Sequence, residues 1–239
     1  MSALRNTHKL RSLIPQQTRE RLYEWHPNRA RRWRRYPGIE KVRATGRAVL
    51  TFDDGPDEDA TPAILESLHA AGARATFFLV GEQLTTHPRI AGEILRCGHE
   101  LGLHGYAHER HDRIDARRSY DDVARGFQAI EQLTGAPPRW YRPPFGKMSD
   151  ASMSACSDLG MTPVYWSAWG HDWEDVGSER IAELACAQLA DGGILLLHDS
   201  SRYGRRPSAV PTAEAIPEVA AWADHAQLRL TSLGEAATA

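Results

Sequence analysis

The stretch Ala48-Val-Leu-Thr-Phe-Asp-Asp-Gly-Pro56 decides the fold, because it joins a short apolar run to a polar turn. Ala48–Phe52 is apolar at nearly every position, which predicts a buried strand. The Gly-Pro pair predicts a tight turn that aims the carboxylates of Asp53 and Asp54 into one space. Two adjacent carboxylates are costly unless a positive group lies near them. The stretch therefore indicates either a cation site, with one carboxylate left free as a base, or an ordinary Asp-Gly turn.

From Arg47 onward, short apolar or β-branched runs alternate with helix-like stretches. The expected strands are Ala48–Phe52, Ala75–Val80, Glu100–His104, Trp140–Arg142, Pro163–Ser167, Ile194–His198 and Leu228–Leu230. Helices are expected to begin near Thr61, His87, Tyr120, Ser149, Ser178 and Thr212. This alternation predicts an α/β fold with a parallel sheet, and seven such units favour a closed or nearly closed (β/α) barrel. In such barrels the reactive residues lie at the C-terminal ends of the strands.

Two histidines follow the third expected strand at a spacing that suits a metal ion. His104 and His108 are four residues apart and can converge on one ion, and imidazole suits Zn²⁺. With Asp54 they complete a set of two histidines and one carboxylate, which leaves positions open for water and substrate. Such a pair alone is weak evidence, since exposed histidine pairs are common. His99 and His111 lie nearby, and we assign them no metal role.

Three further clusters follow other expected strands. In Tyr141–Gly146, two prolines stiffen the turn behind Arg142, which is then suited to pairing with a carboxylate. Trp166–Trp173 is rich in aromatic residues that either line a sugar-sized groove or belong to the core. His198 ends the apolar run Ile194–Leu197, where a barrel would place a proton donor.

In this order, the motifs resemble those of the NodB-homology polysaccharide deacetylases, carbohydrate esterase family 4. The resemblance extends from Arg47 to Glu235. The matching segments are Thr51–Pro56, Arg74–Phe78, Gly98–His108, Arg142–Gly146, Asp172-Trp173 and Leu196–His198. It implies a distorted (β/α) barrel of about seven parallel strands. It also implies metal-dependent hydrolysis of an N-acetyl group on an amino sugar.

The resemblance also implies a role for each matched residue. The ligands of Zn²⁺, or of another divalent ion such as Co²⁺, would be Asp54, His104 and His108. The residues that transfer protons or orient the groups that do so would be Asp53, His198, Arg142 and Asp172. Asp53 would act as general base and His198 would protonate the leaving amine. The oxyanion site and substrate pocket would be formed by Phe145, through its backbone N–H, and by Tyr141, Trp173 and Leu196.

The sequence departs from the family pattern at two positions. The family usually has Ser or Thr after the first metal histidine, where this chain has Gly105, so a hydroxyl that would brace the loop is missing. It usually has an Asp three residues before the Asp-Trp pair, where this chain has Trp169. Neither residue would bind the metal or transfer a proton. The departures therefore bear on substrate choice and loop rigidity more than on the chemistry.

The same residues are compatible with two alternative functions. One is a different C–N hydrolase on the same scaffold, such as a deformylase of a lipid-linked sugar or a cyclic-imide hydrolase. The other is a non-catalytic binder of carbohydrate or of a membrane surface. Asp53 and His198 together argue against the binder, because binding requires neither. Chitin oligosaccharides, peptidoglycan-type glycans and lipid-linked glycans are all compatible substrates.

The charge distribution predicts a basic N-terminal arm, residues 1–43, before a deacetylase domain, residues 44–239. Thirteen Lys or Arg residues and three acidic ones lie up to Arg47, yet the whole chain has a net charge of −2, which argues against nucleic acid as a partner. Leu13–Trp25 could form one amphipathic helix. The arm would either contact anionic membrane lipids or pack on the barrel.

The N-terminus lacks the apolar segment of a secretory signal, so we expect a cytoplasmic protein, peripheral to the inner membrane face if the arm binds lipid. The three cysteines are Cys97, Cys156 and Cys186. They are far apart and odd in number, which predicts neither a disulfide framework nor a thiolate metal site.

Overall fold

The computed structural model describes residues 36–238 of the chain. The chain divides into two compact units, Met1–Pro37 and Gly38–Ala239, and only the second is described below. Ile39 N donates a hydrogen bond to Pro163 O at 2.9 Å, so the last residues before the first strand pack within the second unit. The expected helix Leu13–Trp25 lies outside the described residues. The division into arm and catalytic domain stays a prediction.

Between residues 36 and 238, the structure has an eight-stranded sheet in which every pair of strands is parallel. The strands are β1 (Arg47–Asp53), β2 (Ala75–Leu79), β3 (Glu100–Leu103), β4 (Trp140–Tyr141), β5 (Thr162–Pro163), β6 (Ala168–Trp169), β7 (Ile194–His198) and β8 (Arg229–Thr231). Their order is β5-β4-β3-β2-β1-β7-β6, with β8 also paired to β1. The expected parallel α/β fold is confirmed, as a sheet curled into a barrel whose edge strands are β5 and β6.

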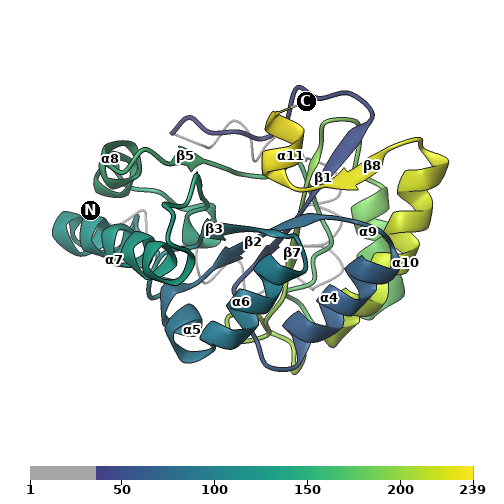
Figure 1. Ribbon diagram of the computed structural model, residues 1–239, viewed down its shortest axis with the longest axis horizontal. Coiled ribbons are helices and arrows are strands. Elements are labelled where there is room, and N and C mark those ends of the chain that lie inside the picture. Colours follow the sequence, from purple (N-terminus) through teal and green to yellow (C-terminus); the bar gives the residue numbers. More distant parts are fainter. Residues whose placement is uncertain (1–35, 239) are drawn as a thin grey trace, which may run out of the picture. The chain divides into compact units, whose positions relative to one another are not determined.

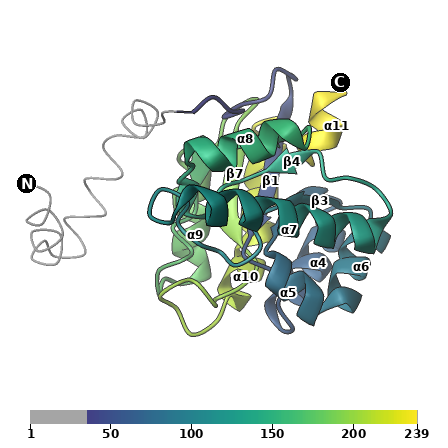
Figure 2. The ribbon, with the colours of Figure 1, turned by 90° about the vertical axis from the view of Figure 1, so that its left-hand side faces the viewer.

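Helices surround this sheet (Figures 1 and 2). They are α4 (Ala60–Ala70), α5 (Gly81–Thr86), α6 (Pro88–Arg96), α7 (Ala116–Thr134), α8 (Asp150–Asp158), α9 (Ser178–Cys186), α10 (Val210–His225) and α11 (Leu233–Ala237), with a 3₁₀ turn at Pro144–Gly146. Helix α7 begins four residues earlier than expected, because the Asp115 side chain caps it by accepting from Arg118 N at 2.9 Å. In the described part of the chain, no helix combines the length and apolar character that crossing a membrane requires.

The expected strand Pro163–Ser167 is wrong. Only its first residue belongs to a strand, and the chain then crosses from β5 to β6, which lie at opposite edges of the sheet. The cause is tertiary, because the Arg142 side chain donates to Tyr165 O at 2.9 Å and to Val164 O at 3.4 Å. These carbonyl groups are therefore satisfied by a guanidinium group instead of by a neighbouring strand.

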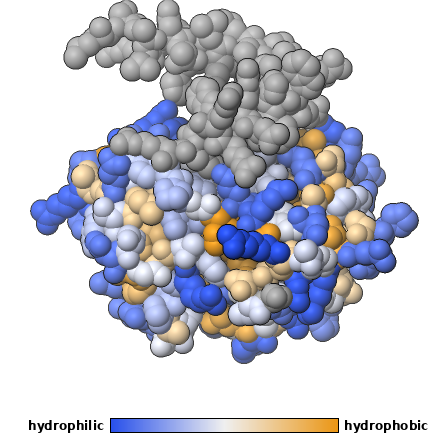
Figure 3. All heavy atoms as spheres, turned by 90° about the horizontal axis from the view of Figure 1, so that it is seen from above, coloured by the Kyte–Doolittle hydropathy of each residue, from blue (hydrophilic) through white to orange (hydrophobic). Residues whose placement is uncertain are grey.

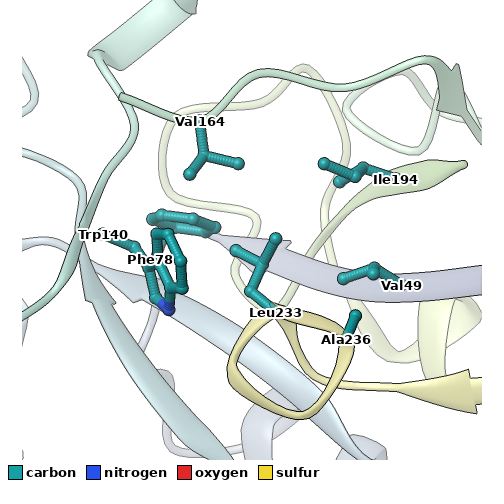
Figure 4. Close-up of a cluster of buried hydrophobic side chains, with 7 residues drawn as sticks. All are labelled: Val49, Phe78, Trp140, Val164, Ile194, Leu233 and Ala236. Atoms are coloured by element: carbon teal, nitrogen blue, oxygen red, sulfur yellow. The ribbon is translucent and has the colours of Figure 1, made fainter. Parts of the chain in front are cut away.

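The interior of the curled sheet holds an apolar cluster that α11 helps to cover (Figure 4). The cluster consists of Val49, Phe78, Trp140, Val164, Ile194, Leu233 and Ala236. Along β1, Thr51 and Asp53 face the same interior, because side chains alternate along a strand and both residues contact the Arg142 side chain. The Arg142 guanidinium lies over the Phe78 ring at 4.2 Å, so the apolar cluster ends where the polar residues begin.

Truncating the α11 residue of this cluster should destabilise the barrel. Leu233 is fully buried, so Leu233→Ala should lower the free energy of unfolding by about 2–4 kcal/mol, the usual cost of an unfilled core cavity. Leu95→Ala is the matched control, because that side chain is 38% exposed and should cost under about 1 kcal/mol. Urea unfolding of both variants measures the difference. Equal costs would mean that α11 does not stabilise the barrel.

Candidate active site

The turn behind β1 holds the two adjacent carboxylates in different directions. Asp54 has a φ of +83°, a left-handed conformation that is uncommon for a residue with a side chain. The next residue, Gly55, donates its N–H to Asp199 Oδ1 at 2.9 Å. A Cβ at Gly55 would lie 2.0 Å from Asp199 Oδ2, so only glycine fits there. Burial raises the pKa of Asp199 to about 7, and the neighbouring Asp54 and Asp57 charges add to the shift.

Asp54, His104 and His108 form a buried cluster that fits a divalent metal ion. Each offers one ligand atom, and these atoms all lie within 4.8 Å of one another. Asp54 Oδ1 lies 3.0 Å from His108 Nε2 and 3.5 Å from His104 Nε2, yet this buried oxygen makes no hydrogen bond to the described residues. Two imidazole nitrogens around such an oxygen are the donor set that zinc-type ions prefer.

The protonation states of this cluster also suit a metal ion. Burial lowers the pKa of His104 to about 4, so the imidazole is neutral at pH 7. Its Nδ1 donates to Arg142 O at 2.8 Å, which leaves Nε2 free to act as a ligand. Burial alone would raise the pKa of Asp54, but the adjacent His108 imidazole, with the charges of His198 and His104, lowers it well below its usual range. A carboxylate and a neutral imidazole are the ligand forms that metals require.

Asp53 is held apart from this cluster by Arg142. Arg142 is fully buried, and its Nη1 donates to Asp53 Oδ1 and to Thr51 Oγ1, both at 2.7 Å. The second carboxylate oxygen of Asp53 lies 3.7 Å from His104 Nε2, on the side of the metal cluster. Thus one oxygen of Asp53 is fixed and the other faces the site.

His198 lies at the end of β7, level with Asp53 in the parallel ladder. Its Nδ1 donates to Asp172 Oδ1 at 2.9 Å, and its backbone N–H donates to Asp172 Oδ2 at 2.7 Å. Burial alone would lower the pKa of His198, but the charge of Asp172 and its hydrogen bond, with the Asp54 and Asp53 charges, raise it to about 9. At neutral pH the imidazole therefore carries a proton that it can donate.

The family model for polysaccharide deacetylase matches residues 40–164, more than half of the chain. The chain belongs to the polysaccharide deacetylase family. The resemblance seen in the sequence motifs is thereby confirmed.

Relatives and solved structures agree with this membership. A chitooligosaccharide deacetylase of Bradyrhizobium sp. is 32% identical over 70% of this chain and 77% of its own length. A peptidoglycan-N-acetylglucosamine deacetylase of Listeria monocytogenes is 29% identical over 68% of this chain, but the match spans only 34% of that longer protein. The family 4 carbohydrate esterase from Streptomyces lividans, solved in complex with acetate, superposes with a TM-score of 0.69 at 28% identity, over 78% of this chain and 92% of that one.

In this polysaccharide deacetylase family member, three of the four expected pocket residues lie at the site. The Phe145 ring is 51% exposed and its centroid lies 4.6 Å from that of His108. Trp173 contacts His198 edge to face at 5.7 Å, and Leu196 is two residues before His198 on β7. Tyr141 is the exception, because it is fully buried and its hydroxyl donates to His111 Nδ1 at 2.9 Å. Side chains alternate along β4, so Arg142 faces the interior and Tyr141 faces the helices.

Asp122 of α7 is a residue beside the site that the motifs did not predict. Its carboxylate accepts from Tyr106 N at 3.0 Å and from Ala107 N at 2.8 Å, both in the loop between His104 and His108. It also accepts from His111 Nε2 at 3.0 Å. This network does what the missing hydroxyl at position 105 would do, since it braces the metal loop from outside. The sequence offered no signal for Asp122, because it lies on a helix outside the motifs, at no characteristic distance from the loop.

The bracing network explains why glycine occupies position 105. Gly105 has a φ of +76°, and a Cβ there would lie 2.7 Å from Asp122 Oδ2, an oxygen that three hydrogen bonds to its carboxylate keep from moving. Gly72 has a similar φ of +60°, but a Cβ there would meet nothing within 4 Å. Alanine substitutions at these two glycines therefore distinguish the stability cost of backbone strain from that of steric contact.

Gly105→Ala should cost clearly more stability than Gly72→Ala. We expect about 1–2 kcal/mol for Gly72→Ala, from left-handed backbone strain alone. Gly105→Ala should cost about 3 kcal/mol or more, because it also displaces Asp122 and leaves buried N–H groups without acceptors. Urea unfolding at one pH measures both values. Equal costs would show that Asp122 moves freely and does not brace the loop.

Proposed function

We propose that this chain is a metal-dependent N-deacetylase that acts on N-acetylated amino sugars. One observation supports the proposal above all. The buried cluster of Asp54 with two histidines is flanked by a carboxylate fixed by Arg142 and, at the next strand, by a protonated His198. These are a metal site, a base and an acid within one interior. A protein that only binds its ligand requires neither a carboxylate fixed by Arg142 nor a protonated His198.

The ligands of the metal would be Asp54, His104 and His108. When bound, Zn²⁺ or another divalent ion such as Co²⁺ would lower the pKa of water and polarise the acetyl carbonyl. Asp53 would accept the proton of the attacking water with the oxygen that Arg142 leaves free. The backbone N–H of Phe145, at the rim beside His108, would donate a hydrogen bond to the oxyanion.

His198 would complete the reaction by protonating the leaving amine as the C–N bond breaks. Its Nδ1 is bonded to Asp172, so Nε2 delivers the proton. Asp172 is itself fixed by the Thr212 hydroxyl at 2.8 Å and holds the charged imidazole in one orientation. An amide needs this step, because an amine anion is a very poor leaving group.

The relatives support a substrate class without fixing the glycan. Their names give peptidoglycan N-acetylglucosamine and chitooligosaccharides as substrates, and we propose that this chain takes a glycan of the same chemistry. A lipid-linked glycan is compatible with the same site. The contact of the basic arm with a membrane and the cytoplasmic location stay predictions.

Acetate release tests the proposed activity. Incubation with chitooligosaccharides and peptidoglycan fragments should release acetate, a chelator should abolish the release, and added Zn²⁺ or Co²⁺ should restore it. Formate release from N-formylated sugars in place of acetate would support a deformylase. Glycan binding without any hydrolysis would contradict the proposal and favour a non-catalytic binder.

The pH dependence should report on His198. Its pKa of about 9 lies above the usual 6.5, so the acid form should be present below that pKa and be lost as the pH rises through it. A bound divalent cation would lower the pKa somewhat, which places the alkaline fall of kcat/KM between about 6.5 and 9. Asp172→Asn removes the largest charge that raises this pKa, so the fall should move to lower pH by about one unit or more. An unchanged alkaline fall in a folded Asp172→Asn variant would remove His198 from the acid role.

A further inference from the structure

The two histidines of the metal cluster are oriented in different ways. His104 donates from Nδ1 to Arg142 O at 2.8 Å. The Nδ1 atom of His108 is buried and has no hydrogen-bond partner among the described residues. A histidine that binds metal almost always donates its second ring nitrogen to an acceptor, which fixes the ring. Something other than a hydrogen bond must therefore orient the His108 ring.

Besides the His104 imidazole, two aromatic rings contact His108. The Tyr203 ring is stacked on the imidazole with centroids 3.9 Å apart and planes 17° apart. The Phe145 ring is tilted by 56° at a centroid distance of 4.6 Å. Of these two contacts, the Tyr203 stack is the closer and the more nearly parallel. His108 also has a φ of +50°, so it lies on a strained backbone that needs support from its surroundings.

Tyr203 is itself held in place from two sides. It lies in the segment between β7 and α10, and its hydroxyl accepts from Gln83 Nε2 of α5 at 3.4 Å. Two residues further along, Arg205 N donates to Trp173 O at 2.6 Å. The buried Arg206 then donates from Nη2 to His198 O at 3.0 Å. The segment that carries the ring is thus tied to the same walls of the site as the proton donor.

We infer that Tyr203 is a positioning residue for His108, and that its ring face takes the place of the missing hydrogen bond. This inference rests on the proposed function, in which His108 is a metal ligand. A flat ring stacked on an imidazole restricts rotation about the last side-chain bond, whereas an aliphatic side chain of similar volume does not. The main contribution therefore comes from the ring and only a minor part from the hydroxyl.

The test is the affinity of the full chain for Zn²⁺ and Co²⁺, measured by competition with a chromophoric chelator. Tyr203→Leu should bind each ion about 10-fold more weakly than wild type. This loss of affinity is typical of removing an aromatic pair or a residue that orients a metal ligand. Tyr203→Phe should recover most of the affinity. Tyr120→Leu is the matched control, because the Tyr120 hydroxyl also bonds a side chain, that of Asp158 on α8, instead of contacting the metal cluster. It should bind as wild type does.

A second measurement covers the case in which Tyr203→Leu does not fold. In the metal-free wild-type protein, the stacked ring should shift the ring protons of His108 upfield in the NMR spectrum. Tyr203→Phe should keep that shift. Where Tyr203→Leu does fold, the absorption of its Co²⁺ form should differ from that of wild type, and that of Tyr203→Phe should match wild type.

The outcomes separate this inference from the proposed function. Wild-type protein that fails to bind either ion stoichiometrically would overturn the proposed function, and the positioning role with it. Stoichiometric binding by wild type together with an affinity of Tyr203→Leu within twofold of it would overturn the inference alone. So would an absence of the ring-current shift at His108.

Discussion

The buried ion pair between Arg142 and Asp53 is the interaction on which the rest of the structure depends. Moving a guanidinium group out of water costs several kcal/mol unless its donors are paired. Here the group is fully buried and donates to Thr51, Asp53 and the carbonyl groups of the segment that follows β5. It lies over Phe78 and thus between the apolar interior and the site. One side chain therefore joins β1, β4 and the crossing segment.

This ion pair lets two adjacent aspartates take different roles. Asp53 is neutralised by a permanent cation that cannot give up its proton under ordinary conditions. Asp54 faces two imidazoles, and its buried oxygen makes no hydrogen bond to the described residues, as suits a metal ligand. Under the proposed function, the same pair of residue types would thus supply a fixed base and a metal ligand. On the face seen in Figure 3, hydrophilic and hydrophobic residues are intermixed.

The sequence was most informative where a residue suited to catalysis or metal binding stands at the end of an expected strand. Strands β1 and β7 could be predicted because each is an apolar run closed by a polar residue. The ligand cluster was predicted from the spacing of His104 and His108 together with the family resemblance. The crossing between β5 and β6 could not be predicted, because the hydrogen bonds that replace its strand pairing come from Arg142, over twenty residues away. Tyr203 and Asp122 were missed for the same reason, since each acts on the site through space from a segment without a motif.

The metal content of two purified variants, Asp54→Asn and Asp53→Asn, tests the division of roles between the adjacent carboxylates most directly. Elemental analysis after loading with Zn²⁺ should find about one ion per chain in wild type and in Asp53→Asn, because Asp53 is held by Arg142 and is not a ligand. Asp54→Asn should retain little, since a ligand set reduced to two histidines holds an ion poorly. Full metal content in Asp54→Asn, or loss of the ion in Asp53→Asn, would contradict the account.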